Sequence, residues 1–205
     1  MKVFVAATQN QHKIEEISAI TRSLGIEVIS RDEAGAGDFE TEEDGETFEA
    51  NSEKKAREVM EACGLPAIAD DSGLMVDALD GRPGVYSARF AGENAGDREN
   101  NEKLLALLAQ VPAGARQARF VSVVTLIYPD GEKIAVRGEC PGRILDAPRG
   151  SGGFGYDPLF VPEGFEKSFG ELTPEEKNKI SHRARALAAL AEALKKKELP
   201  PEDAG

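Results

Sequence analysis

Apolar and polar residues follow strand-like and helix-like periods in turn along the first part of the chain. The apolar run at residues 2–7 predicts a short buried strand. Residues 11–24 place an apolar side chain every three or four positions, which predicts a helix that ends at Gly25. Residues 27–30 return to a strand pattern. This strand–helix–strand beginning favours the α/β class.

The middle of the chain predicts two further helices and three further strands. The helices are expected at residues 47–62 and 97–109. A short strand at residues 67–70 leads directly into two aspartates. The Val-rich residues 119–128 predict the longest strand, and residues 133–140 its hairpin partner across a Pro-Asp-Gly turn.

The last part of the chain predicts one helix and a tail. Thr173 can cap a helix that has Pro174 at its first position and Glu176 three residues after the cap. Apolar side chains then recur on one face as far as Leu194. The charged run 195–205 predicts a frayed end. We expect residues 1–198 to form a single two-lobed domain and residues 199–205 a frayed tail.

Composition and charge exclude several classes of partner. The chain of 205 residues has 25 Lys and Arg against 37 Asp and Glu, a formal charge of −12, which argues against nucleic-acid binding. No apolar run approaches the ~18 residues of a membrane span. Cys63 and Cys140 form no Cys-x-x-Cys motif, so the sequence predicts a cytoplasmic protein without a disulfide or zinc site.

The first candidate site lies between the first strand and the first helix, at residues 8–13. Free backbone N–H groups and the helix dipole favour anions at such a junction. Thr8 and Asn10 can cap the helix, and Lys13 can reach a phosphate. An ordinary capped helix with a solvated lysine explains the same residues and is favoured if they are taken alone.

The second candidate is the pair Asp70-Asp71, followed by Ser72 and Gly73. Two adjacent carboxylates at the end of a buried strand are costly without a nearby positive charge, and Mg²⁺ takes such oxygens. Neighbours in a strand point to opposite faces, so one aspartate is expected to face the site. Ser72-Gly73 then predicts a tight turn. A plain strand-end turn is the equal alternative.

A third group of acidic residues lies in the polar, Gly-rich stretch 31–46, which predicts an exposed loop. Either Glu42 or Glu43 could complete a carboxylate metal site with Asp71. A solvated loop face is the simpler interpretation of these two residues.

A fourth group, the Gly-rich run 150–158, contains the spacing G-x-G-x-x-G. A dinucleotide fold is not favoured, because Pro158 prevents a helix from following. The run predicts a loop in which Phe154 and Tyr156 offer stacking surfaces and Asp157 an acceptor, which suits a purine base. A plain Gly-rich turn is the alternative.

A fifth group lies on the last predicted helix, where Lys177 precedes Ser181-His182-Arg183. Lysine, histidine and arginine supply directional donors to a carbonyl or a phosphate. Taken alone, a solvated helix face explains these residues better.

Taken together, the runs closely resemble the inosine triphosphate pyrophosphatase family, the RdgB/Ham-type dITP/XTP pyrophosphatases. The resemblance implies an α/β fold with an elongated mixed β-sheet, flanking helices and two lobes around a central substrate cleft. It implies a homodimer that hydrolyses the purine nucleoside triphosphates ITP, dITP and XTP to the monophosphate and pyrophosphate with Mg²⁺, clearing deaminated purines. The runs that carry it are residues 7–13, 69–74, 84–90, 153–160 and 171–183.

The resemblance also implies roles for individual residues. Asp71 would be the general base and a metal ligand, with one of Glu42 and Glu43 as the other ligand. The phosphates would be held by Thr8, Gln9, Asn10, Gln11, His12, Lys13, Lys55 and Ser72. The base would be held and read by Phe154, Gly155, Tyr156, Asp157, Lys177, His182 and Arg183.

Two positions depart from the family pattern. Gln9 stands where Gly is frequent, and residues 50–52 read Ala-Asn-Ser where Glu-Asn-Ala is frequent. Neither change removes a charged group that the implied roles use, so activity is expected to be kept.

Two rival functions remain. A Maf-type pyrophosphatase of other base specificity shares the general architecture, but residues 8–10 stand in place of its Ser-x-Ser-Pro-Arg-Arg type motif. A non-catalytic nucleotide-binding protein is the other rival, and the intact Asp71, Lys13 and Lys177 count against it.

Overall fold

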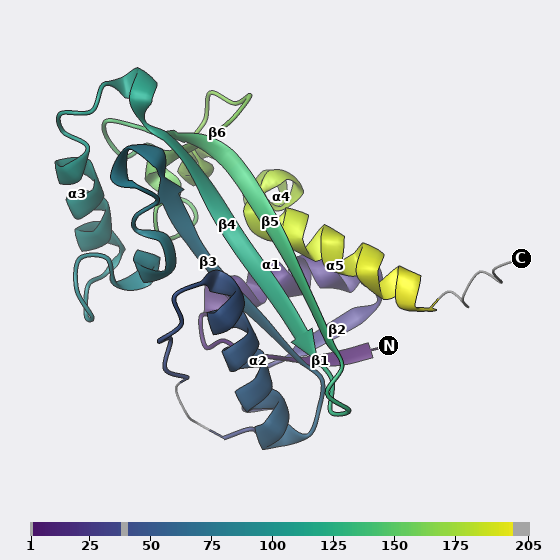
Figure 1. Cartoon of the computed structure of the whole chain (residues 1–205). Helices are drawn as coiled ribbons and strands as arrows, with labels where there is room; N and C mark the ends of the chain where they lie inside the picture. The colour runs from purple at the N-terminus through teal and green to yellow at the C-terminus, as the bar shows by residue number, and fades with distance from the viewer. Residues whose placement is uncertain (1, 38–40, 199–205) are drawn as a thin grey trace, which may run out of the picture.

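A computed structural model describes residues 2–37 and 41–198 of the chain (Figure 1). The strands are β1 (Lys2–Ala6), β2 (Ile26–Ile29), β3 (Ala67–Val76), β4 (Gln117–Ile127), β5 (Lys133–Ile144) and β6 (Phe160–Pro162). The α-helices are α1 (Gln11–Thr21), α2 (Phe48–Cys63), α3 (Asp97–Leu107), α4 (Pro174–Ile180) and α5 (His182–Glu198).

One mixed sheet of six strands, in the order β2-β1-β3-β4-β5-β6, runs through the molecule. β1 pairs in parallel with both β2 and β3. From β3 to β6, each strand pairs antiparallel with the one that follows it in the chain. Together with the flanking helices this arrangement confirms the predicted mixed α/β class (Figure 1). Within the described residues, no helix is long and apolar enough to cross a membrane.

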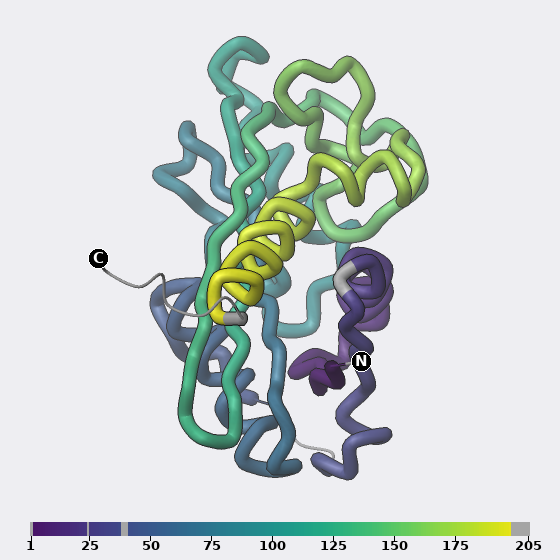
Figure 2. The backbone as a smooth tube through the Cα atoms, turned by 90° about the vertical axis from the view of Figure 1, so that its right-hand side faces the viewer, coloured from purple at the N-terminus to yellow at the C-terminus, as the bar shows by residue number. Residues whose placement is uncertain are grey.

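The alternation of side chains in each strand separates two hydrophobic clusters. Phe4 and Ile68 belong to the cluster formed with α1 and α5. Their neighbours Val5 and Ala69 belong to the cluster formed with α2. Successive strand residues point to opposite faces, so α1 and α5 cover one face of the sheet and α2 the other. Figure 2 shows α5, in yellow, lying along the β4–β5 ribbon.

Close packing of α5 on the sheet depends on Gly138 in β5. A Cβ atom at this position would lie 2.3 Å from the backbone nitrogen of Ala186 and 2.3 Å from the carbonyl oxygen of His182. Neither backbone atom can move without shifting α5, so only glycine fits here.

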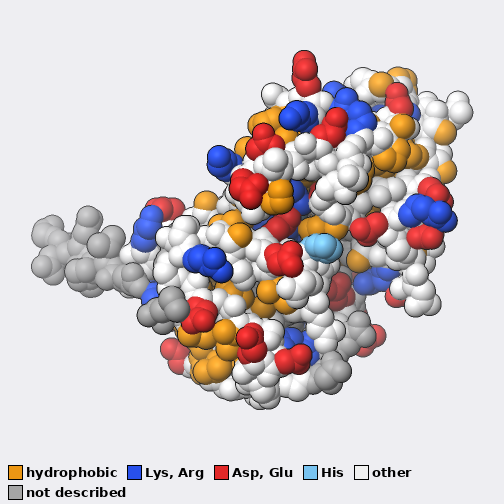
Figure 3. Space-filling view, turned by 180° about the vertical axis from the view of Figure 1, so that it is seen from behind, with side chains coloured by type: hydrophobic (Ala, Val, Ile, Leu, Met, Phe, Trp, Pro, Cys, Tyr) orange, Lys and Arg blue, Asp and Glu red, His pale blue; other side chains and the backbone are white. Residues whose placement is uncertain are grey.

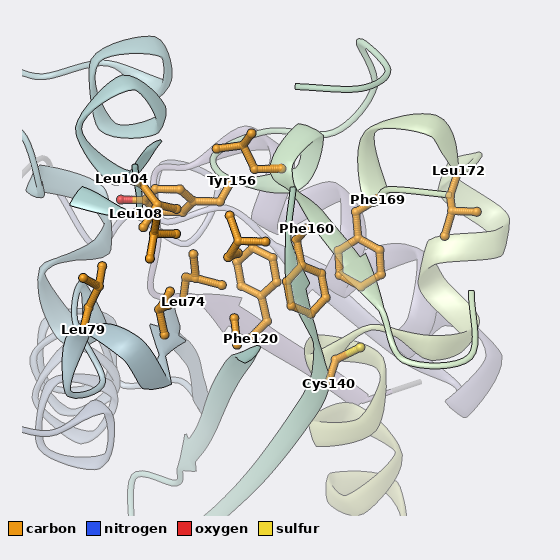
Figure 4. Close-up of a cluster of buried hydrophobic side chains, with 14 residues drawn as sticks. Leu74, Leu79, Leu104, Leu108, Phe120, Cys140, Tyr156, Phe160, Phe169 and Leu172 are labelled. Carbon is orange, nitrogen blue, oxygen red and sulfur yellow. The ribbon is translucent and has the colours of Figure 1, made fainter. Parts of the chain in front are cut away.

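A third cluster fills the far end of the sheet and joins β3–β6 to α3 and the segment before α4 (Figure 4). Its aromatic members Phe120 and Phe160 meet edge to face, with ring centroids 4.8 Å apart. Phe160 also packs against Phe169 at 5.1 Å. This cluster anchors the Gly-rich loop that precedes β6.

Two predicted elements were wrong in extent. The strand expected to end at Asp70 continues as β3 to Val76, and Ser72-Gly73 pair with β4 instead of forming a turn. The single last helix is broken at Ser181, whose backbone is extended. The Ser181 hydroxyl accepts from the backbone N–H of Ala184 and so caps α5, which reaches Glu198 although fraying was expected from Lys195.

Other boundaries agree with the sequence pattern. Thr173 caps α4, with Pro174 at the first position and Glu176 completing the capping box. The short strand β6 was not predicted. The proposed tail 199–205 and residues 38–40 of the acidic loop lie outside the described residues, and the division into two lobes stays a prediction.

Candidate active site

Asp70 is the centre of a group of donors on the α1/α5 face of β3. Its carboxylate lies 3.0 Å from Lys13 Nζ and accepts from Arg183 Nη2 at 3.0 Å. The hydroxyls of Ser72 and Ser122 donate to it as well. Burial by itself would raise the pKa of Asp70, but Arg183 and Lys13 hold it well below the usual range. Asp70 is therefore a fixed anion.

Asp71 points to the α2 face and has a different partner. Lys55 Nζ donates to Asp71 at 2.7 Å, to Glu43 at 2.7 Å and to the carbonyl oxygen of Asp70 at 3.1 Å. Burial raises the pKa of Asp71, although Lys55 opposes the effect. Burial also disfavours the charged form of Lys55, but Asp71 and Glu43 raise its pKa and keep it protonated.

Glu43 is the one of the two loop glutamates that reaches this group. Arg89 donates to the Glu43 carbonyl oxygen at 2.8 Å and lies 3.7 Å from its carboxylate. The neighbouring Glu42 is exposed. Glu43 and Asp71 therefore contact the same lysine, Lys55, whereas Glu42 faces solvent.

The two carboxylates of Glu43 and Asp71 form a donor set that a hard divalent cation can use. Both direct an oxygen at the same point, which Lys55 Nζ now occupies. No group of three or more His, Cys, Asp or Glu side chains in residues 2–37 and 41–198 is arranged for a metal. A two-carboxylate set fits Mg²⁺, which keeps several waters and takes phosphate oxygens in the remaining positions.

The N-terminus of α1 lies beside Asp70 through Lys13. Asn10 caps the helix by accepting from the Lys13 backbone N–H at 3.2 Å, and Thr8 accepts from the Asn10 N–H. Gln9 and Gln11 are exposed. The predicted capped helix is therefore confirmed, and its lysine is directed at a carboxylate.

Phe154 joins the first helix to the Gly-rich loop. Its ring is stacked on His12, with centroids 5.3 Å apart and an 11° angle between the planes. Lys177 Nζ lies 4.8 Å from the centre of the same ring, and the Arg183 guanidinium carbon 6.0 Å. Phe154 and three other residues predicted as substrate contacts, His12, Lys177 and Arg183, thus meet around one aromatic ring.

The Gly-rich loop is held by hydrogen bonds to side chains and to the core. Asp157 accepts from the Phe154 backbone N–H at 2.9 Å and from Lys177 Nζ at 2.7 Å. Gly155 donates its N–H to Asp97 at 2.6 Å. Tyr156 is turned into the core, where its hydroxyl donates to the Ser87 carbonyl at 2.8 Å, so Phe154 is the half-buried ring of the loop.

Glu16 is a site residue that the sequence interpretation missed. Its carboxylate accepts from Lys177 Nζ at 2.7 Å and from Arg183 Nη1. Burial would raise the pKa of Glu16, but Arg183 and Lys177 lower it. The available signal was its position three residues after Lys13, which places both side chains on one face of α1.

His182 opens α5 and is buried against the core. Its ring is stacked on Phe120 at 4.7 Å, and in the described part of the chain its Nδ1 has no hydrogen-bond partner. Burial, with Arg183 and Lys177 nearby, holds the pKa of His182 well below its usual range. The imidazole is neutral and keeps one unused polar atom.

The run 84–90 packs against β3 beside the aspartates. A Cβ atom at Gly73 would lie 2.3 Å from the Gly84 carbonyl oxygen and 2.5 Å from Ser87 Oγ. Ser87 in turn accepts from the Leu74 N–H at 2.9 Å. Gly73 is thus needed for close approach of this run, not for a turn.

The predicted binding cations are all paired with carboxylates in this structure. Lys13, Lys55, Lys177 and Arg183 each contact at least one of Glu16, Glu43, Asp70, Asp71 and Asp157. The hollows of about 440 and 330 Å³ on the surface are lined by other residues. On the face in Figure 3, acidic and basic side chains are interspersed.

Comparison with known proteins identifies relatives of the chain. The model of the Ham1 family matches residues 4–193. The chain belongs to the Ham1 family. A relative in Geobacter sulfurreducens, named dITP/XTP pyrophosphatase, is 51% identical over 195 residues, covering 95% of this chain and 97% of the relative. A dITP/XTP pyrophosphatase of Deinococcus deserti is 52% identical, covering 96% and 91%.

Solved structures of Ham1 family members share the fold. The Ham1 protein of Staphylococcus aureus gives a TM-score of 0.84 at 41% identity, covering 96% of this chain and all of that chain. A HAM1 protein from Coxiella burnetii gives a TM-score of 0.85 at 40% identity over the same shares. The resemblance stated from the sequence runs is confirmed.

Proposed function

We propose that this Ham1 family member hydrolyses dITP, XTP and ITP to the monophosphate and pyrophosphate, with Mg²⁺ as the divalent ion. The observation that carries the proposal is the convergence of Asp71 and Glu43 on one cationic position, next to the donors around Asp70. The names of the relatives, dITP/XTP pyrophosphatase, support the choice of substrates.

Asp71 is the proposed general base. A carboxylate whose pKa burial has raised is a better proton acceptor than an ordinary aspartate, and it can take a proton from the water that attacks the α-phosphorus. Glu43 and Asp71 would hold a divalent ion, which would supply positive charge against the charge that develops on the leaving pyrophosphate. Lys13 and Lys55 would donate N–H groups to the phosphate oxygens.

The base would lie against Phe154, between His12, Lys177 and Arg183. A purine with an oxygen at position 6 accepts hydrogen bonds from such donors, whereas the amine of adenine would face them with its own N–H groups. An unmatched pair of buried donors is costly, which discriminates against ATP. The unused Nδ1 of His182 is a further polar atom near these donors.

A panel of nucleoside triphosphates with Mg²⁺, scored separately for pyrophosphate and orthophosphate, tests the proposal. We expect pyrophosphate from dITP, XTP and ITP and little product from ATP. Turnover of other bases only would favour a Maf-type specificity, and binding without turnover would favour a non-catalytic role. The homodimer that the resemblance implies belongs to the same proposal and is measured by light scattering.

A further inference from the structure

Lys55 uses its entire hydrogen-bonding capacity inside the protein. An ammonium group has three N–H donors and no acceptor. Lys55 Nζ contacts three oxygens: one each on Glu43 and Asp71 at 2.7 Å, and the Asp70 carbonyl at 3.1 Å. Its side chain is only 9% exposed. In this arrangement Lys55 has no donor left for a phosphate.

A divalent ion and the Lys55 ammonium cannot share this position. Mg²⁺ binds carboxylate oxygens at about 2.0–2.1 Å. An ion bound by the same oxygens of Glu43 and Asp71 would compete with the Lys55 nitrogen for them, and the two cations would repel each other at such short range.

We propose that Lys55 is the internal counter-ion of the Glu43–Asp71 pair in the free protein, and that it must leave before a divalent ion can be held by both carboxylates. The inference rests on the proposed function. When Lys55 leaves, its three N–H donors become free for phosphate oxygens. Uptake of the ion and release of Lys55 are therefore two halves of a single exchange.

The backbone that carries the two carboxylates is held by contacts that do not involve Lys55. The backbone of Asp71 is fixed by the pairing of β3 with β4, opposite Val123. Glu43 is held through its backbone carbonyl by Arg89 at 2.8 Å. The pair therefore remains available for the ion after the exchange.

Titration calorimetry with Mg²⁺ alone, without nucleotide, tests the exchange. Lys55→Met removes the competing ammonium, so it should bind the ion at least about tenfold more tightly than the wild type. Lys54→Met is the matched control, because it removes the same charge from the preceding residue of α2, where Lys54 pairs with Asp44 at 2.8 Å. The control should match the wild type within about twofold.

A second measurement uses the unaltered protein and decides the matter if Lys55→Met does not fold. Acylation of lysine amines is followed by mass spectrometry with and without Mg²⁺. We expect Lys55 to react slowly in the free protein and several-fold faster with the ion, while Lys54 is unchanged.

Two results would overturn the inference: a Lys55→Met affinity no tighter than wild type, or labelling of Lys55 that saturating Mg²⁺ leaves unchanged. Both measurements omit nucleotide, so they are independent of the substrate panel. A failed panel with a successful exchange rejects the proposed reaction alone, and a successful panel without exchange rejects only the role of Lys55.

Discussion

Asp70 and Asp71 are consecutive residues of β3, yet different cations on opposite faces of the sheet hold their carboxylates. Asp70 is paired with Lys13 and Arg183, whereas Asp71 is paired with Lys55. The pKa of Asp70 is lowered and that of Asp71 is raised. One aspartate is thus suited to holding the site together, and the other to accepting a proton.

Replacing Asp71 with Asn should remove activity without unfolding the protein. Loss of a general base lowers kcat by about 10²–10⁴-fold. The free energy of unfolding should fall less than in Asp70→Asn, because Lys55 keeps Glu43 at 2.7 Å as a charged partner. Steady-state kinetics, calorimetric binding of ITP and urea unfolding measure these quantities. A rate near wild type would exclude Asp71 as the base.

Replacing Asp70 with Asn, unlike Asp71→Asn, should strongly lower the free energy of unfolding. Removing one partner of a buried ion pair costs about 3–5 kcal/mol, because Arg183 and Lys13 keep their charges. Urea unfolding at neutral pH measures the loss. Asp146→Asn is the control, since Asp146 pairs with Arg116 at 2.9 Å but is 74% exposed, and should cost less than about 1 kcal/mol.

The same aspartate predicts a pH dependence of stability. The folded-state pKa of Asp70 lies well below its ordinary value of 3.8, so the unfolded chain binds this proton more tightly. The contribution of Asp70 is therefore complete above the ordinary value and is lost as pH falls toward the folded-state pKa. Unfolding free energies measured across acid pH should fall less steeply in Asp70→Asn than in wild type; parallel curves would contradict this.

Replacing Glu16 with Gln should weaken nucleotide binding more than chemistry. The variant keeps the side-chain size but loses the charge that holds Lys177 and Arg183. We expect KM for ITP to rise about tenfold, with kcat changed far less, because Asp71 lies on the other face of the sheet. Glu15→Gln, at an exposed neighbouring position, should leave both constants unchanged.

Replacing Arg89 with Ala should raise the Mg²⁺ concentration needed for half-maximal rate, by about tenfold, because Arg89 positions Glu43 through its backbone carbonyl. Titration of the rate with Mg²⁺ at saturating ITP measures the change. Arg98→Ala is the control, since Arg98 is 81% exposed on α3. An unchanged Mg²⁺ requirement would show that Glu43 does not depend on Arg89.

Sequence periodicity predicted the elements whose hydrophobic pattern and caps agree, such as α1 with Asn10 and α4 with Thr173. It failed at β3, because Asp70 to Gly73 have turn-forming composition and only tertiary partners keep them extended. The partners are Arg183 and Ser122 for Asp70, and Val121 of β4 for Gly73.

Some charged residues of the candidate site could be predicted from the sequence, and others could not. Lys13, Lys177 and Arg183 could be singled out from their runs, but Glu16 looks like any solvated helix residue until its two partners are brought to it by folding. The choice between Glu42 and Glu43 likewise depends on the path of the loop past Lys55 and Arg89, which no local pattern encodes.

Arg183 joins residues that are very distant along the chain: Asp70 is 113 positions before it, and Glu16 is 167. Translation makes β3 long before α5, so the growing chain carries Asp70 without its guanidinium partner. Lys13 is made before β3 and can pair with Asp70 early, but the buried charge lacks its second cation until Arg183 arrives with α5. Assembly of the candidate site is therefore a late event during synthesis, completed when α5 docks onto β3.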